Sequence, residues 1–218
     1  MLAISDFTRE FPVVLKTDRD CEMPLVVEFI SARAPVQSLL DVGAHWSGHH
    51  YANSIRGFVG DYVGIDIQPP DSITGKILNT YHTGNVNDFP FNRLFDAVIC
   101  VSTIEHAGVS TYKADYVKER MALFHKCIRL ARKHVWISFP VGQEYMEPGQ
   151  LAIITEDHLA AFESMTKDFK VKKRFIYSQG PQAGHPWREH GKREVAVRIP
   201  YISTNGNQSI CAIEIDKI

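Results

Sequence analysis

Residues 36–50 read VQSLLDVGAHWSGHH, and this stretch decides how the rest of the chain is interpreted. Its first half is an apolar run of strand length that ends at an aspartate and a glycine, Asp41 and Gly43. Its second half contains three histidines within six residues. Two interpretations follow: a metal-binding loop, or a strand and turn that bind a cofactor and whose histidines are incidental.

The three histidines are His45, His49 and His50. His45 and His49 are four residues apart, a spacing that places two side chains on one face only within a helix. His45 is expected in the turn before the helix, and no nearby acid or cysteine supplies a third ligand to a zinc ion, which usually has about four. The sequence therefore predicts a cofactor loop over residues 43–48 and no metal site.

Outward from this stretch, predicted strands alternate with predicted helices. Strands are predicted at VQSLLDV (36–42), DYVGIDI (61–67), ILNTYHTGN (77–85), FDAVICVS (95–102), HVWISFPVG (134–142), VKKRFIYS (171–178) and QSICAIEID (208–216). Helices are predicted at MPLVVEFISARAP (23–35, with Pro24 in the first turn), SGHHYANSIRGF (47–58), residues 112–134, and a segment capped by Thr155. REVAVRI (193–199) suits either a strand or a short helix.

The predicted strands are too apolar to be half-exposed, which indicates a mainly parallel sheet covered on both faces. We expect one α/β domain with a mostly parallel seven-stranded sheet, helices on both faces, and residues 36–42 in its centre. Residues 1–35 would form an N-terminal helical segment and residues 36–142 the cofactor-binding core. Residues 143–218 would complete the sheet and contribute the acceptor site.

Composition limits the possible partners and location. The chain has 218 residues, 44% hydrophobic and 22% charged, with a formal net charge of -1. This charge gives no attraction to nucleic acid or an anionic membrane, and the basic run at residues 167–174 is expected to be a solvated face. No apolar stretch approaches the roughly 20 residues of a membrane span. Four scattered cysteines without a CxxC pair and an N-terminus unlike a signal peptide favour the cytoplasm.

In an open α/β sheet, ligands bind beyond the carboxyl ends of the strands. The first predicted strand ends at Asp41-Val42-Gly43, and glycine permits close approach of a ligand to the backbone. The second ends in Asp66, about 20 residues after Gly43, a distance that suits an acid binding ribose hydroxyls. The next two strands end in GNVNDFPF (84–91) and STIEH (102–106).

These motifs, in order and content, resemble those of the class I S-adenosylmethionine-dependent methyltransferases. The likeness covers residues 36–142: LLDVG, YVGIDI, GNVNDFPF and FDAVICVSTIEH are similar to the first four motifs, and HVWISFPVG to the fifth strand. More narrowly, STIEHAG resembles bacterial methyltransferase-like proteins found among polysaccharide and secondary-metabolite genes. The resemblance implies a Rossmann-like fold, S-adenosyl-L-methionine as cofactor, and methyl transfer to a small molecule or sugar.

The resemblance also implies roles for individual residues. Asp41 and Gly43 would shape the pocket beside the methionine part of the cofactor, and Asp66 would hold the ribose. Asn85 stands where an aspartate often meets the adenine amino group, for which Asp88 is a second candidate, while Val86 would offer its backbone N–H. The implied cofactor-binding residues are Asp41, Gly43, Ala44, Asp66, Ile67, Asn85, Val86, Asp88 and Ser102.

One departure from the family pattern leaves alternatives open. The family's first loop usually runs GxGxG, whereas residues 43–48 read GAHWSG, lack the middle glycine and are one residue longer. A non-catalytic S-adenosylmethionine-binding module is therefore an alternative, and a nicotinamide-dependent oxidoreductase is a weaker one because G-x-G-x-x-G is absent.

His106, in the Glu105-His106 pair, is the predicted general base if the acceptor is a hydroxyl, although such a pair often follows the fourth strand of the family without being catalytic. His185 and His190 either line the acceptor site or lie in a surface loop. Trp46 and Trp187 are either lids or packing anchors.

Overall fold

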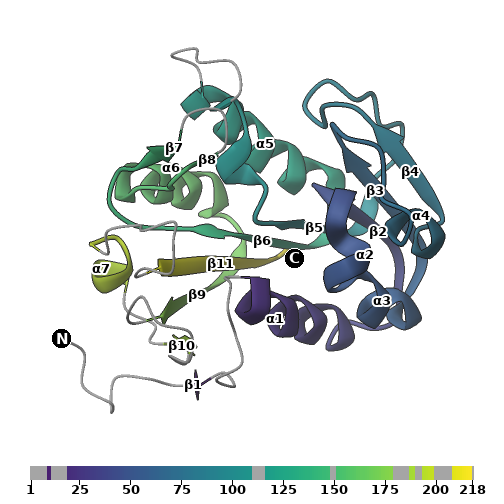
Figure 1. Ribbon diagram of the computed structural model, residues 1–218, viewed down its shortest axis with the longest axis horizontal. Helices are drawn as coiled ribbons and strands as arrows, with labels where there is room; N and C mark the ends of the chain where they lie inside the picture. Colours follow the sequence, from purple (N-terminus) through teal and green to yellow (C-terminus); the bar gives the residue numbers. More distant parts are fainter. Residues whose placement is uncertain are drawn as a thin grey trace.

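The computed structural model describes residues 9–10, 19–109, 116–147, 151–178, 187–189, 193–198 and 208–217. A mixed β-sheet runs through the molecule (Figure 1). Among the described residues its strands are β1 (Arg9–Glu10), β2 (Val36–Val42), β3 (Val59–Asp66), β4 (Thr80–Thr83), β5 (Phe95–Val101), β6 (Ala131–Pro140), β9 (Lys170–Ser178), β10 (Trp187–Glu189) and β11 (Gln208–Asp216). Their order is β1-β10-β9-β11-β6-β5-β2-β3-β4.

The seven predicted strands correspond to β2, β3, β4, β5, β6, β9 and β11. Neighbours from β4 to β6 pair in parallel, whereas β11 is antiparallel to both β6 and β9. The prediction that β2 lies inside the sheet is confirmed, because it pairs with β3 on one side and β5 on the other. The sequence did not predict β1 and β10, two short antiparallel strands beyond β9, because two or three residues show no periodicity.

The helices are α1 (Arg19–Ser31), α2 (Ser47–His50), α3 (Ala52–Ile55), α4 (Thr74–Ile77), α5 (Tyr116–Leu130), α6 (Glu156–Thr166) and α7 (Arg193–Ala196), with the 3₁₀ turns η2 (Ala44–Trp46), η3 (Arg56–Phe58) and η4 (Ile104–His106). A separate two-stranded sheet joins β7 (Met146–Glu147) to β8 (Leu151–Ala152). The predicted cap of α6 is confirmed, since Thr155 and His158 form a capping box. The REVAVRI segment starts as the short helix α7.

The buried side chains form two clusters, and successive residues of a strand alternate between them because their side chains point to opposite faces. Val98 and Cys100 of β5 belong to the cluster that includes Phe124 of α5, and Ile99 to the cluster that includes Phe29 of α1. Figure 1 shows α5 and α6 on one side of the sheet and α1 on the other. The whole of β5 is buried as a result.

Three helix predictions are corrected. The single helix at residues 47–58 is divided into α2, α3 and η3. The helix at residues 112–134 ends at Leu130, because Ala131 already pairs with Phe95 as part of β6; its first predicted residues lie outside the described part of the chain. Pro24 lies inside α1 rather than in its first turn, because the helix begins at Arg19 and not at residue 23 as expected.

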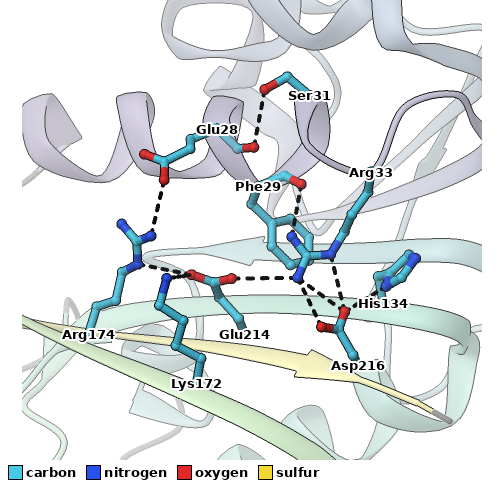
Figure 2. A network of polar contacts seen from close by, with 9 residues as sticks. All are labelled: Glu28, Phe29, Ser31, Arg33, His134, Lys172, Arg174, Glu214 and Asp216. Atoms are coloured by element: carbon cyan, nitrogen blue, oxygen red, sulfur yellow. Dashed lines mark hydrogen bonds and ion pairs between the residues drawn. The ribbon is translucent and has the colours of Figure 1, made fainter.

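The basic run at residues 167–174 differs from the expected solvated face at its C-terminal end. The Arg174 side chain is only 9% exposed and forms ion pairs with Glu214 at 2.9 Å and with Glu28 of α1 at 3.1 Å. Arg33 donates to both carboxylate oxygens of Asp216, each at 3.1 Å. Figure 2 shows this network between α1 and the strands β9 and β11. It fixes α1 against the sheet.

The cysteines and the helices add two observations. The four cysteines, Cys21, Cys100, Cys127 and Cys211, are buried thiols that form no disulfide. None of the helices in the described part of the chain is long and apolar enough to cross a bilayer.

Candidate functional site

The carboxyl ends of the parallel strands meet at one edge of the sheet. Val42 of β2 pairs with Ile65 of β3 and with Cys100 of β5, and Asp66 pairs with Thr83 of β4. The residues that follow these strands are therefore neighbours. This register brings together the segments in which the sequence analysis placed the cofactor: the turn after β2, the end of β3, and the residues after β4 and β5.

Gly43 makes the turn at the end of β2 with a left-handed backbone, φ 81°. Its N–H donates to the carbonyl of Ile65 at 2.9 Å. A Cβ atom built on Gly43 would lie 1.9 Å from Oγ1 of Thr103, the second residue after β5. Glycine is therefore required here by the close approach of the segment after β5, and not only by the approach of a ligand. The sequence alone gave no sign of this contact.

The turn after Gly43 is held by the segment that follows β3. Thr74 accepts a hydrogen bond from the Gly48 N–H at 2.9 Å and donates to the His45 carbonyl at 3.1 Å. The His45 ring bonds to the carbonyl of Pro69, whereas His49 lies 3.5 Å from Asp71.

His45 and His49 thus have different partners. Among the residues that the structure describes, no group of three or more His, Cys, Asp or Glu side chains is placed to hold a metal ion.

Asp66 closes β3 with a partly buried carboxylate. One oxygen accepts the N–H of Gln68 at 2.9 Å and the other accepts the N–H of His45 at 3.2 Å. A carboxylate offers about four lone-pair sites, so about two remain for another donor such as a pair of hydroxyls. The next residue, Ile67, is 70% exposed, which leaves an apolar surface directly beside this carboxylate.

The segment after β4 contains the remaining residues expected around adenine. Val86 is 7% exposed and belongs to the hydrophobic core, whereas Asn85 and Asp88 are exposed. The side-chain oxygen of Asn85 accepts the N–H of Asn87 at 3.0 Å, which makes an Asx turn. That oxygen is engaged within its own turn, so the side-chain NH2 of Asn85 is the part that remains available to a ligand.

Asp41 is fully buried behind the Gly43 turn. Its two oxygens accept hydrogen bonds from the hydroxyls of Tyr51 and Tyr62, each at 2.8 Å. Burial raises the pKa of Asp41 to about 6, although the hydrogen bonds from Tyr62 and Tyr51 favour the charged form. Asp41 therefore joins β2, β3 and the end of α2. Neither tyrosine was singled out from the sequence, because only the folded chain brings them to the carboxylate.

We expect the Asp41→Asn variant to show the cost of this burial. The raised pKa means that the folded state binds more protons than the unfolded state between pH 3.8, the ordinary pKa of an aspartate, and about 6. The stabilisation is complete below the unfolded pKa and is lost as the pH rises through the folded pKa. Above that pH the variant should be more stable than the wild type by up to about 3 kcal/mol, at 1.36 kcal/mol per pKa unit.

Urea denaturation of both proteins between pH about 4 and about 7 measures this difference in unfolding free energy. A difference that stays constant over the range would contradict the assignment of the raised pKa to Asp41.

At the end of β5, Ser102 contacts Glu22, a residue that the sequence analysis did not identify. Ser102 has φ 40°, an uncommon value for a residue other than glycine. Its hydroxyl donates to the carboxylate of Glu22 at 2.6 Å, and Glu22 is a fully buried residue of α1. The signal that could have pointed to Glu22 is its place as an acid in the largely apolar stretch CEMPLVVEFI. Helix α1 therefore contributes a carboxylate to the carboxyl edge of the sheet.

His106 is the last residue of η4, the turn that follows β5 at this edge of the sheet. Its side chain is 47% exposed, and Nε2 lies 3.7 Å from Oε1 of Glu105, whose side chain is 3% exposed. The pair thus places an accessible imidazole in front of a buried carboxylate, an arrangement suited to accepting a proton.

Of the remaining candidates, His185 and His190 lie outside the described residues. For Trp187 only the backbone is described, in β10. Trp46 is 56% exposed and contacts the rings of His45 and His49. This exposure argues against a packing anchor for Trp46.

The order β4-β3-β2-β5-β6-β11-β9, with a glycine turn after β2 and an acid closing β3, is the fold of the class I S-adenosylmethionine-dependent methyltransferases. Three solved structures illustrate the likeness. The N-methyltransferase NodS from Bradyrhizobium japonicum in complex with S-adenosyl-L-homocysteine has a TM-score of 0.58 at 12% identity, over 93% of this chain and 90% of that chain.

Magnesium protoporphyrin IX methyltransferase from Synechocystis with bound S-adenosylmethionine has a TM-score of 0.53 at 13% identity, over 93% of this chain and 86% of that chain. The sugar N-methyltransferase KedS8 from Streptoalloteichus has a TM-score of 0.50 at 16% identity, over 81% and 89%. No protein-family model and no curated protein sequence matches the chain. At these identities the likeness establishes the fold.

Proposed function

We propose that this protein is an S-adenosylmethionine-dependent methyltransferase that acts on a small-molecule or sugar acceptor. One observation carries the proposal: the turn at Gly43 and the carboxylate of Asp66 lie side by side at the carboxyl ends of β2 and β3. Similar folds include methyltransferases with S-adenosylmethionine or S-adenosylhomocysteine bound. We propose further that the chain is a single domain with helices on both faces of the sheet, and that it is cytoplasmic.

The residues at this edge suit the three parts of the cofactor. Asp66 would bind the ribose hydroxyls with its remaining lone pairs. The exposed side chain of Ile67 would cover one face of the adenine, and the amide of Asn85, the Val86 N–H and the Asp88 carboxylate would surround its edge. The turn at Gly43 and Ala44 would lie beside the methionine part together with Ser102, with Asp41 holding the turn from behind.

Bound S-adenosylmethionine supplies an activated methyl group for an in-line displacement. The protein's own task is to align donor and acceptor and to keep water away, and this contributes up to roughly 7–11 kcal/mol. A hydroxyl acceptor must also lose a proton. His106 would accept it, because its exposed imidazole lies beside the buried carboxylate of Glu105.

We expect wild-type protein to bind S-adenosylhomocysteine and the Asp66→Ala variant to bind it about 10- to 150-fold more weakly, which corresponds to about 1.5–3 kcal/mol for hydrogen bonds to a charged group. Isothermal titration calorimetry measures both affinities. Asp61→Ala is a matched control, because Asp61 lies near the other end of β3 and pairs with Arg93. It should bind the ligand as the wild type does.

Wild-type affinity in folded Asp66→Ala protein would show that the ribose assignment is wrong. Binding of NADH without binding of S-adenosylhomocysteine would favour the oxidoreductase instead. The binding-module alternative retains a specific argument, since residues 44–50 form η2 and α2 in place of a glycine-rich loop. A protein that binds the cofactor but transfers no methyl group to a broad panel of acceptors would support it.

A further inference from the structure

The backbone of His45 joins the Gly43 turn to the segment that follows β3. Its N–H donates to the Asp66 carboxylate at 3.2 Å. Its carbonyl accepts the Thr74 hydroxyl at 3.1 Å and the Asp71 N–H at 3.4 Å. The two parts of the chain on which the proposed cofactor site depends are therefore bonded to each other through this residue.

The ring of His45 makes a further bond to the same segment. Its Nδ1 atom faces the carbonyl oxygen of Pro69. A carbonyl oxygen can only accept a hydrogen bond, so Nδ1 carries the proton, and Nε2 of the neutral ring carries none. Because Pro69 and Pro70 have no N–H, these two residues can be hydrogen-bonded only through their carbonyls. The histidine ring supplies the donor that Pro69 needs.

The position of the His45 ring is itself restricted by a second aromatic contact. The ring centroids of His45 and Trp46 are 4.7 Å apart, and the planes cross at 86°. This edge-to-face geometry is one that aromatic pairs favour. Trp46 in turn contacts the ring of His49, with centroids 5.6 Å apart. A ring that is held by Trp46 can hold the Pro69 carbonyl in a fixed place.

The orientation of the Asp66 carboxylate depends on where this segment lies. One oxygen accepts the N–H of Gln68 at 2.9 Å, a local bond between residues two apart. The other accepts the N–H of His45, which is 21 residues away in the sequence. The second bond exists only while the segment after β3 stays against the Gly43 turn. A carboxylate that binds two ribose hydroxyls at once needs such a fixed orientation.

We propose that His45 is a positioning residue for the cofactor: its Nδ1–H holds the Pro69 carbonyl and thereby keeps Asp66 directed at the ribose. The inference rests on the proposed methyltransferase function. This is also the position at which the chain departs from GxGxG, since residue 45 is a histidine where that pattern has its middle glycine. The histidine orders the segment before the cofactor binds, so less ordering is needed on binding.

The first measurement tests the hydrogen bond itself. Two-bond ¹H–¹⁵N NMR correlations of the imidazole rings at pH about 8, above the usual titration range of histidine, show which nitrogen carries the proton. We expect the His45 ring, assigned by the loss of its signals in His45→Ala, to carry the proton on Nδ1. A proton on Nε2 would overturn the proposal, because the Pro69 carbonyl would then have no donor.

The second measurement asks whether the bond serves the cofactor. Calorimetry with S-adenosylhomocysteine compares the wild type with His45→Ala and with His45→Asn, whose side-chain NH2 can take the place of Nδ1–H. His45→Ala should bind about three- to tenfold more weakly, the scale of one net hydrogen bond, because Asp66 is in place in a smaller share of the molecules. His45→Asn should recover most of the affinity. His125→Ala, at an exposed position of α5, is the control and should bind as the wild type does.

The outcomes separate this inference from the proposed function. Equal affinities of the wild type and His45→Ala, or an asparagine variant as weak as the alanine variant, would overturn the role of the Nδ1–H group. Binding by the wild type would in both cases leave the methyltransferase proposal standing. A wild type that does not bind S-adenosylhomocysteine would contradict the proposed function, and the assignment of His45 to a cofactor site with it.

Discussion

Gly43→Val should lower the free energy of unfolding by about 2–5 kcal/mol and abolish binding of S-adenosylhomocysteine. Two costs combine. A left-handed backbone costs a residue with a Cβ about 1–2 kcal/mol, and φ at Gly43 is 81°. Overpacking costs about 1–3 kcal/mol more, because the new Cβ would lie 1.9 Å from Oγ1 of Thr103. Thr103 cannot move freely, since its hydroxyl donates to the Val101 carbonyl at 3.0 Å.

Urea denaturation measures the loss, and Gly57→Val is the matched control, because nothing lies within 4 Å of a Cβ at Gly57. The control should stay within about 1 kcal/mol of the wild type. Combining Gly43→Val with Thr103→Gly should recover part of the loss, because the clash disappears and only the backbone strain remains. A Gly43→Val protein as stable as Gly57→Val would show that the close approach of Thr103 does not restrict this position.

His106→Ala should lower turnover by about 10²-fold or more if the acceptor is a hydroxyl, the scale on which a positioned base contributes. The imidazole is 47% exposed at the carboxyl edge and has the Glu105 carboxylate 3.7 Å behind it. Cofactor affinity should change little, because the base acts on the acceptor. The kcat provides the measurement once an acceptor is found.

His106→Gln, which keeps a polar side chain of similar reach, is the control and should be as slow as His106→Ala. An unchanged rate in both variants would show that His106 does not act as a base.

The sequence predicted those parts of the fold that follow from local periodicity. The buried strand β5 is apolar at nearly every position, and β2 ends in an aspartate and a glycine, so both could be recognised without neighbours. Asp66 could be placed beside Gly43 because carboxyl ends of adjacent parallel strands meet at one edge.

The features that were missed depend on contacts between distant segments. Thr103 restricts Gly43 from 60 residues further along the chain, and Glu22 reaches Ser102 across 80 residues. The hydroxyls that bond to Asp41 come from α2's end and from β3. The single helix predicted over residues 47–58 is interrupted at Tyr51, which has a non-helical φ of −121° and whose hydroxyl donates to the buried Asp41, a contact that no periodic pattern reveals.

The proposed function depends above all on S-adenosylmethionine binding at the Gly43 turn and Asp66. A crystal structure of the protein with S-adenosylhomocysteine tests this most directly. We expect both ribose hydroxyls on the Asp66 carboxylate, adenine between Ile67 and the Asn85–Asp88 segment, and the methionine part beside Gly43. A nucleoside bound away from Asp66, or a metal ion coordinated by His45 and His49 in its place, would show that this edge of the sheet is not the cofactor site.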